Sequence, residues 1–475
     1  METQTNGFYG VNLVAVTVTS GTTNKYDVGL EKPVSRSAAP ALPGPIVARR
    51  LMQRQQITLR IKPSEELAIQ SSSLQSKTMF HTVEAAAPDA ILGLNEAFRQ
   101  DTNPNKINLS VGQYKDASGA TPVLKCVKQA ETYLLENESS KGYLDMTGHP
   151  EYDRLVPELL FTAEHPAIAN DRLVTMQTPG GTGALRVAAD FLHRVFPEKS
   201  VWLSQPTWPN HPNIFKAAGV NVESYAYYDS EKFALNFDSM LADLKKIPAG
   251  DVVLLHGCCH NPTGVDLEPE HWAEVGQVVK ERGLLPLVDF AYQGFADGLD
   301  EDAVGVRKLS EFVDELLVCS SFSKNFGLYR ERVGAFTVVA SNPTEKAAVL
   351  SRVKQCIRTN YSNPPSHGAS IVATILSNAD LKQLWCDELA EMRDRINSLR
   401  QAFADNMAPR GLPIDFSFIT QQRGMFSFSG LTPEHVNRLR EEHSIYIVGS
   451  GRINVAGMTQ DNIGTVCDAI ATVVG

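Results

Sequence analysis

The chain reads Glu315-Leu316-Leu317-Val318-Cys319-Ser320-Ser321-Phe322-Ser323-Lys324 where a short apolar run passes into a small polar segment with one lysine. The run Glu315 to Val318 predicts a buried strand, and a second apolar run follows from Val333 to Ala340. A lysine at the end of a buried strand is partly desolvated, so its pKa falls and its amine becomes a nucleophile toward carbonyl carbons. A solvated lysine at an ordinary strand-to-loop junction is the plainer interpretation of this stretch alone. The neighbouring motifs must therefore decide between the two.

The alternation of an apolar run with a polar tip recurs along the chain from about residue 172 to 340. Apolar runs at 172–176, 201–204, 252–256 and 284–288 each end in polar or glycine-rich residues and lead toward a helix. Such units predict a mostly parallel sheet, and ligands bind these sheets at the carboxyl ends of the strands. We therefore expect the tips to meet in one crevice. The tip residues are Trp208, Asn261, Asp289, Tyr292 and Lys324.

Three of these polar segments contain residues whose binding role can be predicted. The glycines and threonine of Gly180-Gly181-Thr182-Gly183 open a helix that we predict from Ala184 to Phe196, and backbone N–H groups at a helix start bind phosphate. No lysine follows in the register of a Walker A motif. Trp208 stands between prolines and offers a plane for stacking on a flat ring. Asn261-Pro262 before a glycine predicts a fixed turn, with a cis bond as one form of it, that aims the asparagine amide.

Beyond the repeated units, apolar residues keep helical spacing from Leu381 to Met407 and predict one long helix that can link two domains. Alternating residues at 425–428 and 445–448 predict strands, and Gly451-Arg452-Ile453-Asn454 places one arginine at a glycine-rich bend. A further helix is predicted from Val123 to Leu135.

Composition sets limits on function. A chain of 475 residues is too long for one simple core, so two or three units are expected. The hydrophobic share of 43% and the charged share of 21% are typical of a soluble globular protein, and no apolar run is long enough to span a bilayer. The net charge of 44 − 54 = −10 argues against nucleic-acid and membrane partners.

The seven cysteines are odd in number, form no C-x-x-C pair and lie mostly among apolar residues, so we expect reduced thiols and a cytoplasmic protein. The stretch His256-Gly257-Cys258-Cys259-His260 does concentrate metal-capable side chains. Neighbouring residues on an extended segment point to opposite faces, however, and structural zinc ligands come in separated pairs. We therefore expect no metal site.

Residues 1–78 differ in character from the rest of the chain. They hold three prolines between 40 and 45 and nine basic residues against five acidic ones. Leu13 to Thr19 could form a strand, but a disordered extension is the expectation. The arginine-rich stretch from Arg36 to Lys62 leaves an organelle leader open, although Asp27 and Glu31 argue against it. Translation from Met52 or Met79 is a hypothesis, which an intact mass that includes residue 1 would exclude.

The tips together match the needs of pyridoxal phosphate. Its aldehyde requires a lysine, its phosphate a helix start and an arginine, its ring a stacking plane, its pyridine nitrogen an anion and its phenolic oxygen hydrogen-bond donors. From Met79 to the C-terminus the chain also resembles the aspartate aminotransferases, of the fold-type I class of pyridoxal-phosphate enzymes. The motifs that carry the resemblance are Gly180 to Arg186, His260 to Gly264, Asp289 to Phe295, Ser321 to Gly327 and Gly451 to Gly457.

The resemblance implies an α/β fold in which a large domain with a mostly parallel sheet is flanked by helices. A smaller α+β domain would come from both ends of the core. The implied division is an N-terminal extension at 1–78, an arm and part of the small domain at 79–121, the large cofactor-binding domain at 122–390 and the rest of the small domain at 391–475. A homodimer with shared active sites is implied as well.

The resemblance also implies the site residues. Lys324 would bind the cofactor covalently and shuttle the proton, with Asp289 on the pyridine nitrogen and Tyr292 on the phenolic oxygen as further catalytic groups. The other cofactor-binding residues would be Gly181, Thr182, Trp208, His211, Asn261, Ser321, Ser323, Arg332 and, from the neighbouring subunit, Tyr143. Substrate would be bound by Arg452 at the α-carboxylate, by Arg358 of the partner subunit at the distal carboxylate, and by Gly112, Trp208, Asn261 and Phe426. Taken singly, most of these have a structural explanation; their joint order favours the site.

The implied reaction transfers the amino group of L-aspartate to 2-oxoglutarate in two half-reactions, through a ping-pong mechanism. An aromatic amino acid aminotransferase of the same subgroup is the alternative. A non-catalytic regulatory or binding protein of the same fold is the alternative from another class. Ser110 and Gln113 flank Gly112 where the family pattern has smaller or apolar residues, which concerns the segment that closes over substrate.

Overall fold

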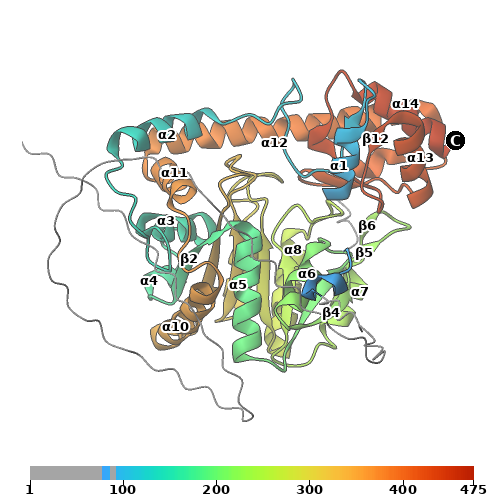
Figure 1. Ribbon diagram of the computed structural model, residues 1–475. Coiled ribbons are helices and arrows are strands. Elements are labelled where there is room, and N and C mark those ends of the chain that lie inside the picture. Colours follow the sequence, from blue (N-terminus) through green and yellow to red (C-terminus); the bar gives the residue numbers. More distant parts are fainter. Residues whose placement is uncertain (1–77, 86–91) are drawn as a thin grey trace, which may run out of the picture. The chain divides into compact units, whose positions relative to one another are not determined.

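The computed structural model describes residues 78–85 and 92–475 (Figure 1). The chain divides into two units, Met1–Val83 and Glu84–Gly475. In the first unit the described residues contain one 3₁₀ helix, η1 (Met79–Thr82). The expectations for residues 1–77, including the strand from Leu13 to Thr19 and the start at Met52, lie outside the described residues.

A seven-stranded sheet forms the centre of the second unit, with the strand order β2-β10-β9-β8-β7-β3-β4. Five of its strands run parallel to their neighbours, while β10 is antiparallel to both β9 and β2. The predicted mostly parallel sheet is therefore confirmed, with one exception that has a simple cause. Only residues 322–332 separate β9 from β10, and this loop is too short to hold the crossover that a parallel neighbour needs.

Helices cover both faces of this sheet (Figure 1), which explains why its central strands β7, β8 and β9 are mostly apolar. In β7, Val252 and Leu254 pack into one hydrophobic core, on the side of α5, while Val253 and Leu255 pack into the other. In β7, β8 and β9 the polar side chains lie at or next to the carboxyl end, at His256, Asp289, Ser320 and Ser321.

The helices and strands have the following bounds. The helices are α1 (Leu92–Gln100), α2 (Lys125–Asn137), α3 (Pro150–Phe161), α4 (Pro166–Ala169), α5 (Gly180–Val195), α6 (Asn210–Ala217), α7 (Phe237–Leu244), α8 (Pro269–Arg282), α9 (Val304–Phe312), α10 (Pro343–Asn360), α11 (Ser366–Ser377), α12 (Ala379–Met407), α13 (Pro433–His443) and α14 (Ile463–Val474). The strands are β1 (Ile107–Asn108), β2 (Leu173–Pro179), β3 (Ser200–Gln205), β4 (Asn221–Ala226), β5 (Tyr228–Asp229), β6 (Ala234–Leu235), β7 (Val252–His256), β8 (Leu285–Phe290), β9 (Leu316–Ser321), β10 (Val333–Val339), β11 (Phe426–Phe428), β12 (Ile445–Tyr446) and β13 (Arg452–Asn454). Three more 3₁₀ helices are η2 (Ala408–Arg410), η3 (Phe416–Gln421) and η4 (Val455–Gly457).

A smaller α+β region combines the two ends of the second unit. Strand β1 pairs in parallel with β12, so Ile107 lies opposite Ile445 across more than 300 residues of sequence. Strand β11 pairs with β13 in antiparallel fashion. Helix α12 runs from the helices beside the central sheet to this region (Figure 1), and it matches the long linking helix expected from Leu381 to Met407. The implied fold class is confirmed.

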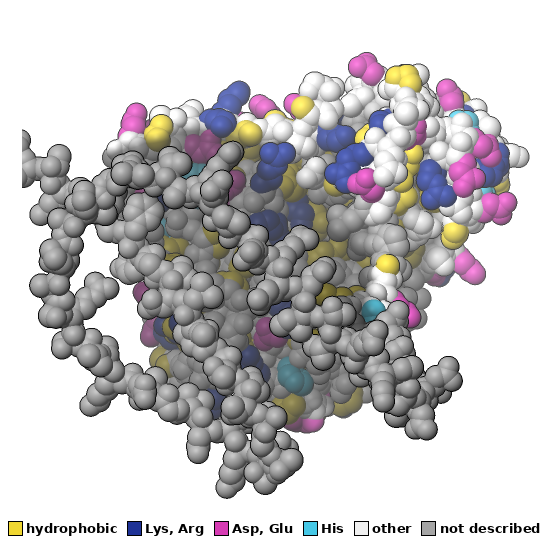
Figure 2. All heavy atoms as spheres, viewed as in Figure 1, with side chains coloured by type: hydrophobic (Ala, Val, Ile, Leu, Met, Phe, Trp, Pro, Cys, Tyr) yellow, Lys and Arg dark blue, Asp and Glu magenta, His cyan; other side chains and the backbone are white. Residues whose placement is uncertain are grey.

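Within the described residues, no helix is both long and apolar enough to cross a membrane. Where α12 to α14 reach the surface, basic and acidic side chains intermix on the face that Figure 2 shows. In α13 Arg438 pairs with Glu442, and Arg410 pairs with Asp468 of α14. This part of the face therefore carries no single-sign patch of the kind that binds nucleic acid.

Candidate active site

A cavity of about 230 Å³ lies where the carboxyl ends of the central strands meet the α+β region. All five tip residues that the sequence singles out line it. The lining residues are Gly112, Gly181, Thr182, Leu185, Trp208, Asn261, Asp289, Ala291, Tyr292, Ser321, Ser323, Lys324, Tyr329, Arg332, Phe426 and Arg452.

Lys324 lies in the loop that follows β9, three residues after the last strand residue. Its amine Nζ is 4.4 Å from the centre of the Tyr292 ring. Desolvation by burial lowers the pKa of the Lys324 amine to about 8; Asp289 opposes this shift, and Arg332 and Arg452 add to it. The amine is thus far closer to its neutral, nucleophilic form at neutral pH than an ordinary lysine.

Asp289 belongs to β8 and is one end of a chain of polar contacts. Its Oδ2 accepts a hydrogen bond from Nε2 of His211 at 2.9 Å, and Nδ1 of His211 lies 2.7 Å from Oγ1 of Thr207. That hydroxyl is in turn 3.1 Å from Nε2 of His256. Burial alone would raise the pKa of Asp289, but the His211 hydrogen bond and the nearby charges of His211, His256 and Lys324 hold it below its usual value. Asp289 is therefore a buried, charged carboxylate that faces the cavity.

The start of α5 forms a cradle for an anion. The first helical residue is Gly180, so the glycine-rich stretch is the first turn of the helix rather than the loop before the predicted start at Ala184. A Cβ added to Gly180 would lie 2.5 Å from Nη2 of Arg332, and one added to Gly181 would lie 3.0 Å from Cβ of Ser321. Arg332 Nη1 also donates to Oγ of Ser323 at 3.2 Å. Backbone N–H groups, serine hydroxyls and one guanidinium thus surround a space suited to phosphate.

Arg452, the first residue of β13, lies on the opposite wall and is 3% exposed. Its Nη1 donates to Oδ1 of Asn261 at 3.1 Å, and its Nη2 donates to the backbone carbonyl of Ser110 at 2.7 Å. Its guanidinium carbon is 4.0 Å from the centre of the Phe426 ring. Burial lowers the pKa of Arg452 to about 10, so the group stays charged and can bind a carboxylate as a planar fork. The Asn261–Pro262 bond beside it is cis, a form that the sequence admits.

The segment around Gly112 is held against this wall. A Cβ on Gly112 would lie 2.6 Å from Cζ of Phe426, so a larger residue would displace the ring. The side-chain amide of Asn454 donates to the carbonyls of Val111 and Gln113 at 2.7 and 2.9 Å. The backbone carbonyl of Ser110 accepts from Arg452, and that of Gln113 accepts from Asn454. Neither contact uses the Ser110 or Gln113 side chain.

Three of the residues implied by the resemblance do not line the cavity: His211, which is buried and hydrogen-bonded to Asp289, Tyr143 and Arg358. Tyr143 is 97% exposed, and Arg358 is exposed near the end of α10, where its Nη1 contacts the hydroxyl of Ser362. Both were expected to act in the neighbouring subunit, and a single chain leaves that expectation untested.

Sequence reasoning missed Leu185, Ala291 and Tyr329, which also line the cavity. Leu185 could have been predicted as a lining residue, because it lies four residues after Gly181 and hence on the same face of α5. We recognise no sequence pattern that would have predicted Tyr329. Its hydroxyl is held by a distant contact, because it accepts a hydrogen bond at 2.9 Å from the backbone N–H of Tyr114, 215 positions away.

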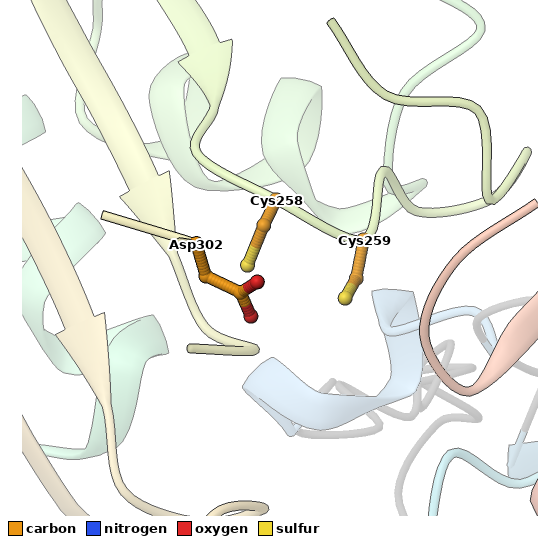
Figure 3. A group of neighbouring side chains, drawn as sticks. All are labelled: Cys258, Cys259 and Asp302. Atoms are coloured by element: carbon orange, nitrogen blue, oxygen red, sulfur yellow. The ribbon is translucent and has the colours of Figure 1, made fainter. Parts of the chain in front are cut away.

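The cysteines of the His256–His260 stretch do lie together, contrary to the expectation that they point to opposite faces. Cys259 has φ of +51°, and this left-handed turn brings its sulfur, the sulfur of Cys258 and an oxygen of Asp302 within 4.8 Å of one another (Figure 3). Both Asp302 oxygens, however, already accept two backbone hydrogen bonds each. The donors are Gly294 and Ala296 to Oδ2, and Asp297 and Gly298 to Oδ1. Asp302 thus organises a loop, and the group offers a cation only its two thiols, whose pKa values burial raises.

Comparison with known proteins places these features in a family. The family model described as aminotransferase class I and II matches residues 104–470. An aspartate aminotransferase of Escherichia coli is 56% identical over 395 residues, which are 83% of this chain and all of that protein. An aromatic-amino-acid aminotransferase of Pseudomonas aeruginosa is 48% identical over 83% of this chain and 98% of its own length. A crystal structure of the aromatic-amino-acid aminotransferase of Burkholderia pseudomallei, covalently bound to pyridoxal phosphate, superimposes with a TM-score of 0.82 at 48% identity, over 84% of this chain and all of that one.

The match to the family model spans most of the chain, and the identity to whole relatives is high. The chain therefore belongs to the class I and II aminotransferases.

Proposed function

We propose that the protein is a pyridoxal-phosphate-dependent aminotransferase that transfers the amino group of L-aspartate to 2-oxoglutarate, in two half-reactions. One observation carries the proposal. A desolvated lysine amine, a charged buried carboxylate and a buried arginine line the same cavity, beside a helix start that can hold phosphate. The identity to relatives named aspartate aminotransferase supports the choice of substrate.

The described residues fit the cofactor. The first turn of α5 with Ser321, Ser323 and Arg332 would hold its phosphate, and Trp208 would stack on its ring. Asp289, held by His211, would keep a proton on the ring nitrogen, while Tyr292 and Asn261 would donate to the phenolic oxygen. When bound, the cofactor supplies an electron sink for the charge left when a proton leaves the substrate α-carbon.

The remaining roles fall to the substrate groups. Arg452 would bind the α-carboxylate as a two-pronged fork, and Lys324 Nζ would take the proton from the substrate α-carbon, in a cavity from which Phe426 helps to exclude water. We further propose a homodimer, in which Tyr143 of the partner subunit reaches the phosphate and Arg358 of the partner subunit binds the distal carboxylate. The exposure of both side chains in the single chain supports this arrangement.

We also propose the domain division given by the sequence, with residues 122–390 as the large domain and residues 79–121 and 391–475 as the smaller one. The pairing of β1 with β12 supports joining the two outer segments. We place the protein in the cytoplasm, with the support of seven unpaired cysteines, six of them buried.

The aromatic alternative rests on relatives and on a solved structure named for aromatic substrates. We expect kcat/KM for aspartate to exceed that for phenylalanine, each measured against 2-oxoglutarate, because only aspartate presents a distal carboxylate to an arginine. A charged hydrogen-bonded pair of this kind corresponds to roughly a ten- to hundredfold preference. Replacing Arg358 by Lys should lower the value for aspartate and leave that for phenylalanine unchanged. A higher kcat/KM for phenylalanine in the unaltered enzyme would assign the protein to the aromatic group.

A second prediction concerns pH. The cofactor-free protein should capture pyridoxal phosphate at a rate that rises with pH through about 8, because only the neutral amine attacks an aldehyde and the pKa of Lys324 is lowered to about 8. Stopped-flow absorbance across the neutral to alkaline range measures the midpoint. In an Asp289→Asn variant the midpoint should move lower still, since Asp289 is the group that raises this pKa. A midpoint near the ordinary value of 10.5 would contradict a desolvated amine.

A further inference from the structure

Arg400 is a buried cation outside the active-site cavity, on the long helix α12. It is 2% exposed, and it makes no ion pair with any carboxylate of the described residues. Isolating a charge from water in this way costs several kcal/mol unless other groups compensate it. Burial lowers the pKa of Arg400 to about 10, so the side chain is still charged at neutral pH. Groups close to Arg400 must therefore stabilise this charge.

Backbone carbonyls take the place of a counter-ion. Nη2 of Arg400 donates to the carbonyl of Gly424 at 2.6 Å and reaches that of Phe426 at 3.4 Å. Nη1 donates to Oδ1 of Asn397, one turn earlier on the same helix, at 3.2 Å. The guanidinium thus ties α12 to the residues that lead into β11. A planar fork can reach separate acceptors at once, which the single ammonium group of a lysine cannot do in the same geometry.

The segment at Gly424 that Arg400 binds is also held by a contact on its opposite side. Gly424 has φ of +77°, and a Cβ there would lie 2.4 Å from Cβ of Cys259. Gly424 is therefore pressed between the large-domain turn at Cys259 and the Arg400 guanidinium, so it has little freedom to move once Arg400 is in place.

Two contacts lead from this segment into the active site. The Phe426 ring lies 4.0 Å from the guanidinium carbon of Arg452 and also abuts Gly112. In the β11–β13 pair, Phe426 lies opposite Asn454 and Phe428 lies opposite Arg452. A shift of β11 would therefore move both the ring that covers Arg452 and the strand that carries it. Displacements of about 1 Å in such positions can cost on the order of a hundredfold in rate.

We propose that Arg400 is a positioning residue that fixes β11, and through Phe426 and β13 holds Arg452 in the orientation that binds the substrate carboxylate. The proposal rests on the proposed function, in which Arg452 binds that carboxylate. Arg400 touches neither substrate nor cofactor, so its loss should weaken carboxylate binding and spare cofactor binding.

Succinate, a dicarboxylate without an amino group, tests this with the holoenzyme. Calorimetric titration should show Kd for succinate rising roughly ten- to hundredfold in Arg400→Lys, with KM for aspartate rising by a similar factor and the content of bound pyridoxal phosphate unchanged. Arg393→Lys is the matched control, because Arg393 is a partly buried arginine of the same helix whose carbonyl partner is Gly294 rather than β11. That variant should bind succinate like the unaltered protein. An Arg400→Lys variant with unaltered succinate affinity and a lowered Tm would show a structural role only and overturn the proposal.

Chemical rescue is a second experiment that tests the proposal. A cavity of about 290 Å³ adjoins Arg400 and is lined also by Asn397, Gln401, Thr420, Arg423 and Asp297. It gives a guanidinium ion access to the space that Arg400→Ala would leave. Added guanidinium should restore succinate affinity in that variant and leave Arg393→Lys unaffected; rescue of Tm without rescue of affinity would contradict the proposal. If the unaltered holoenzyme bound no succinate, the proposed function would fail instead, so the two failures are distinguishable.

Discussion

Lys324→Ala is expected to abolish transamination while the chain still binds pyridoxal phosphate. Among the described residues, Lys324 is the one lysine that lines the cavity, and its pKa is lowered to about 8, so the variant loses the amine that serves as base for the substrate α-proton. Loss of a positioned general base alone lowers turnover by about 10²- to 10⁴-fold, and loss of the covalent attachment adds to that. The phosphate cradle at α5 and Arg332 is untouched, so cofactor should still bind non-covalently.

The measurement is steady-state turnover of the variant beside its content of pyridoxal phosphate after gel filtration. Lys346→Ala is a suitable control, because Lys346 is a mostly buried lysine that pairs with Asp171 and does not line the cavity. It should keep full activity. Substantial turnover by Lys324→Ala would refute the role of this lysine, and loss of cofactor from both variants would point to misfolding rather than chemistry.

Asp289→Asn is expected to lower kcat by about a hundred- to a thousandfold and to change KM much less. Asparagine has nearly the same shape and can keep a contact with His211, but it cannot hold a proton on a ring nitrogen by its charge. The carboxylate is buried, and its pKa is held below the usual value by His211 and the neighbouring charges, so it is anionic throughout the neutral range. Removing one preorganised electrostatic partner in a desolvated site typically costs 10²- to 10³-fold in kcat.

The split between kcat and KM is the informative result, because Arg452 and Asn261 remain in place to bind substrate. Asp190→Asn serves as the control: Asp190 is a partly buried carboxylate of α5 that pairs with Arg186, outside the cavity lining. Near-normal kcat in Asp289→Asn would show that the charge at this position does not take part in the reaction.

The sequence allowed the fold class and the meeting of the tips to be predicted, because the central strands β7, β8 and β9 are apolar except at or next to their carboxyl ends. Trp208, Asn261, Asp289, Tyr292 and Lys324 accordingly line one cavity. Periodicity located the starts of the predicted strands to within one residue, but β2 and β9 each continue three residues beyond the predicted run, and Asp289 lies inside β8 rather than after it. The polar strand β4 was not predicted. A polar residue that follows an apolar run thus predicts the site more reliably than it predicts where the strand ends.

Other features depend on backbone angles and distant contacts that no local pattern carries. The sequence predicted that Cys258 and Cys259 point apart, which holds for an extended chain but not for one with a left-handed residue at Cys259. The short strand β13 was interpreted as a glycine-rich bend, since three residues are too few to show a period. The helical pattern from Leu381 to Met407 gives no sign of a role for Arg400, whose partners at Gly424 and Phe426 lie 24 and 26 residues away.

One measurement tests the central claim most directly: the visible absorbance of the purified holoenzyme as L-aspartate and then 2-oxoglutarate are added. A cofactor bound to Lys324 should give a visible band, aspartate alone should shift it as the amino group is taken up, and 2-oxoglutarate should restore it. A protein that shows no such band, or a band that aspartate leaves unchanged, would contradict the assignment of Lys324, Asp289 and Arg452 to a transaminating site and favour a non-catalytic member of the fold.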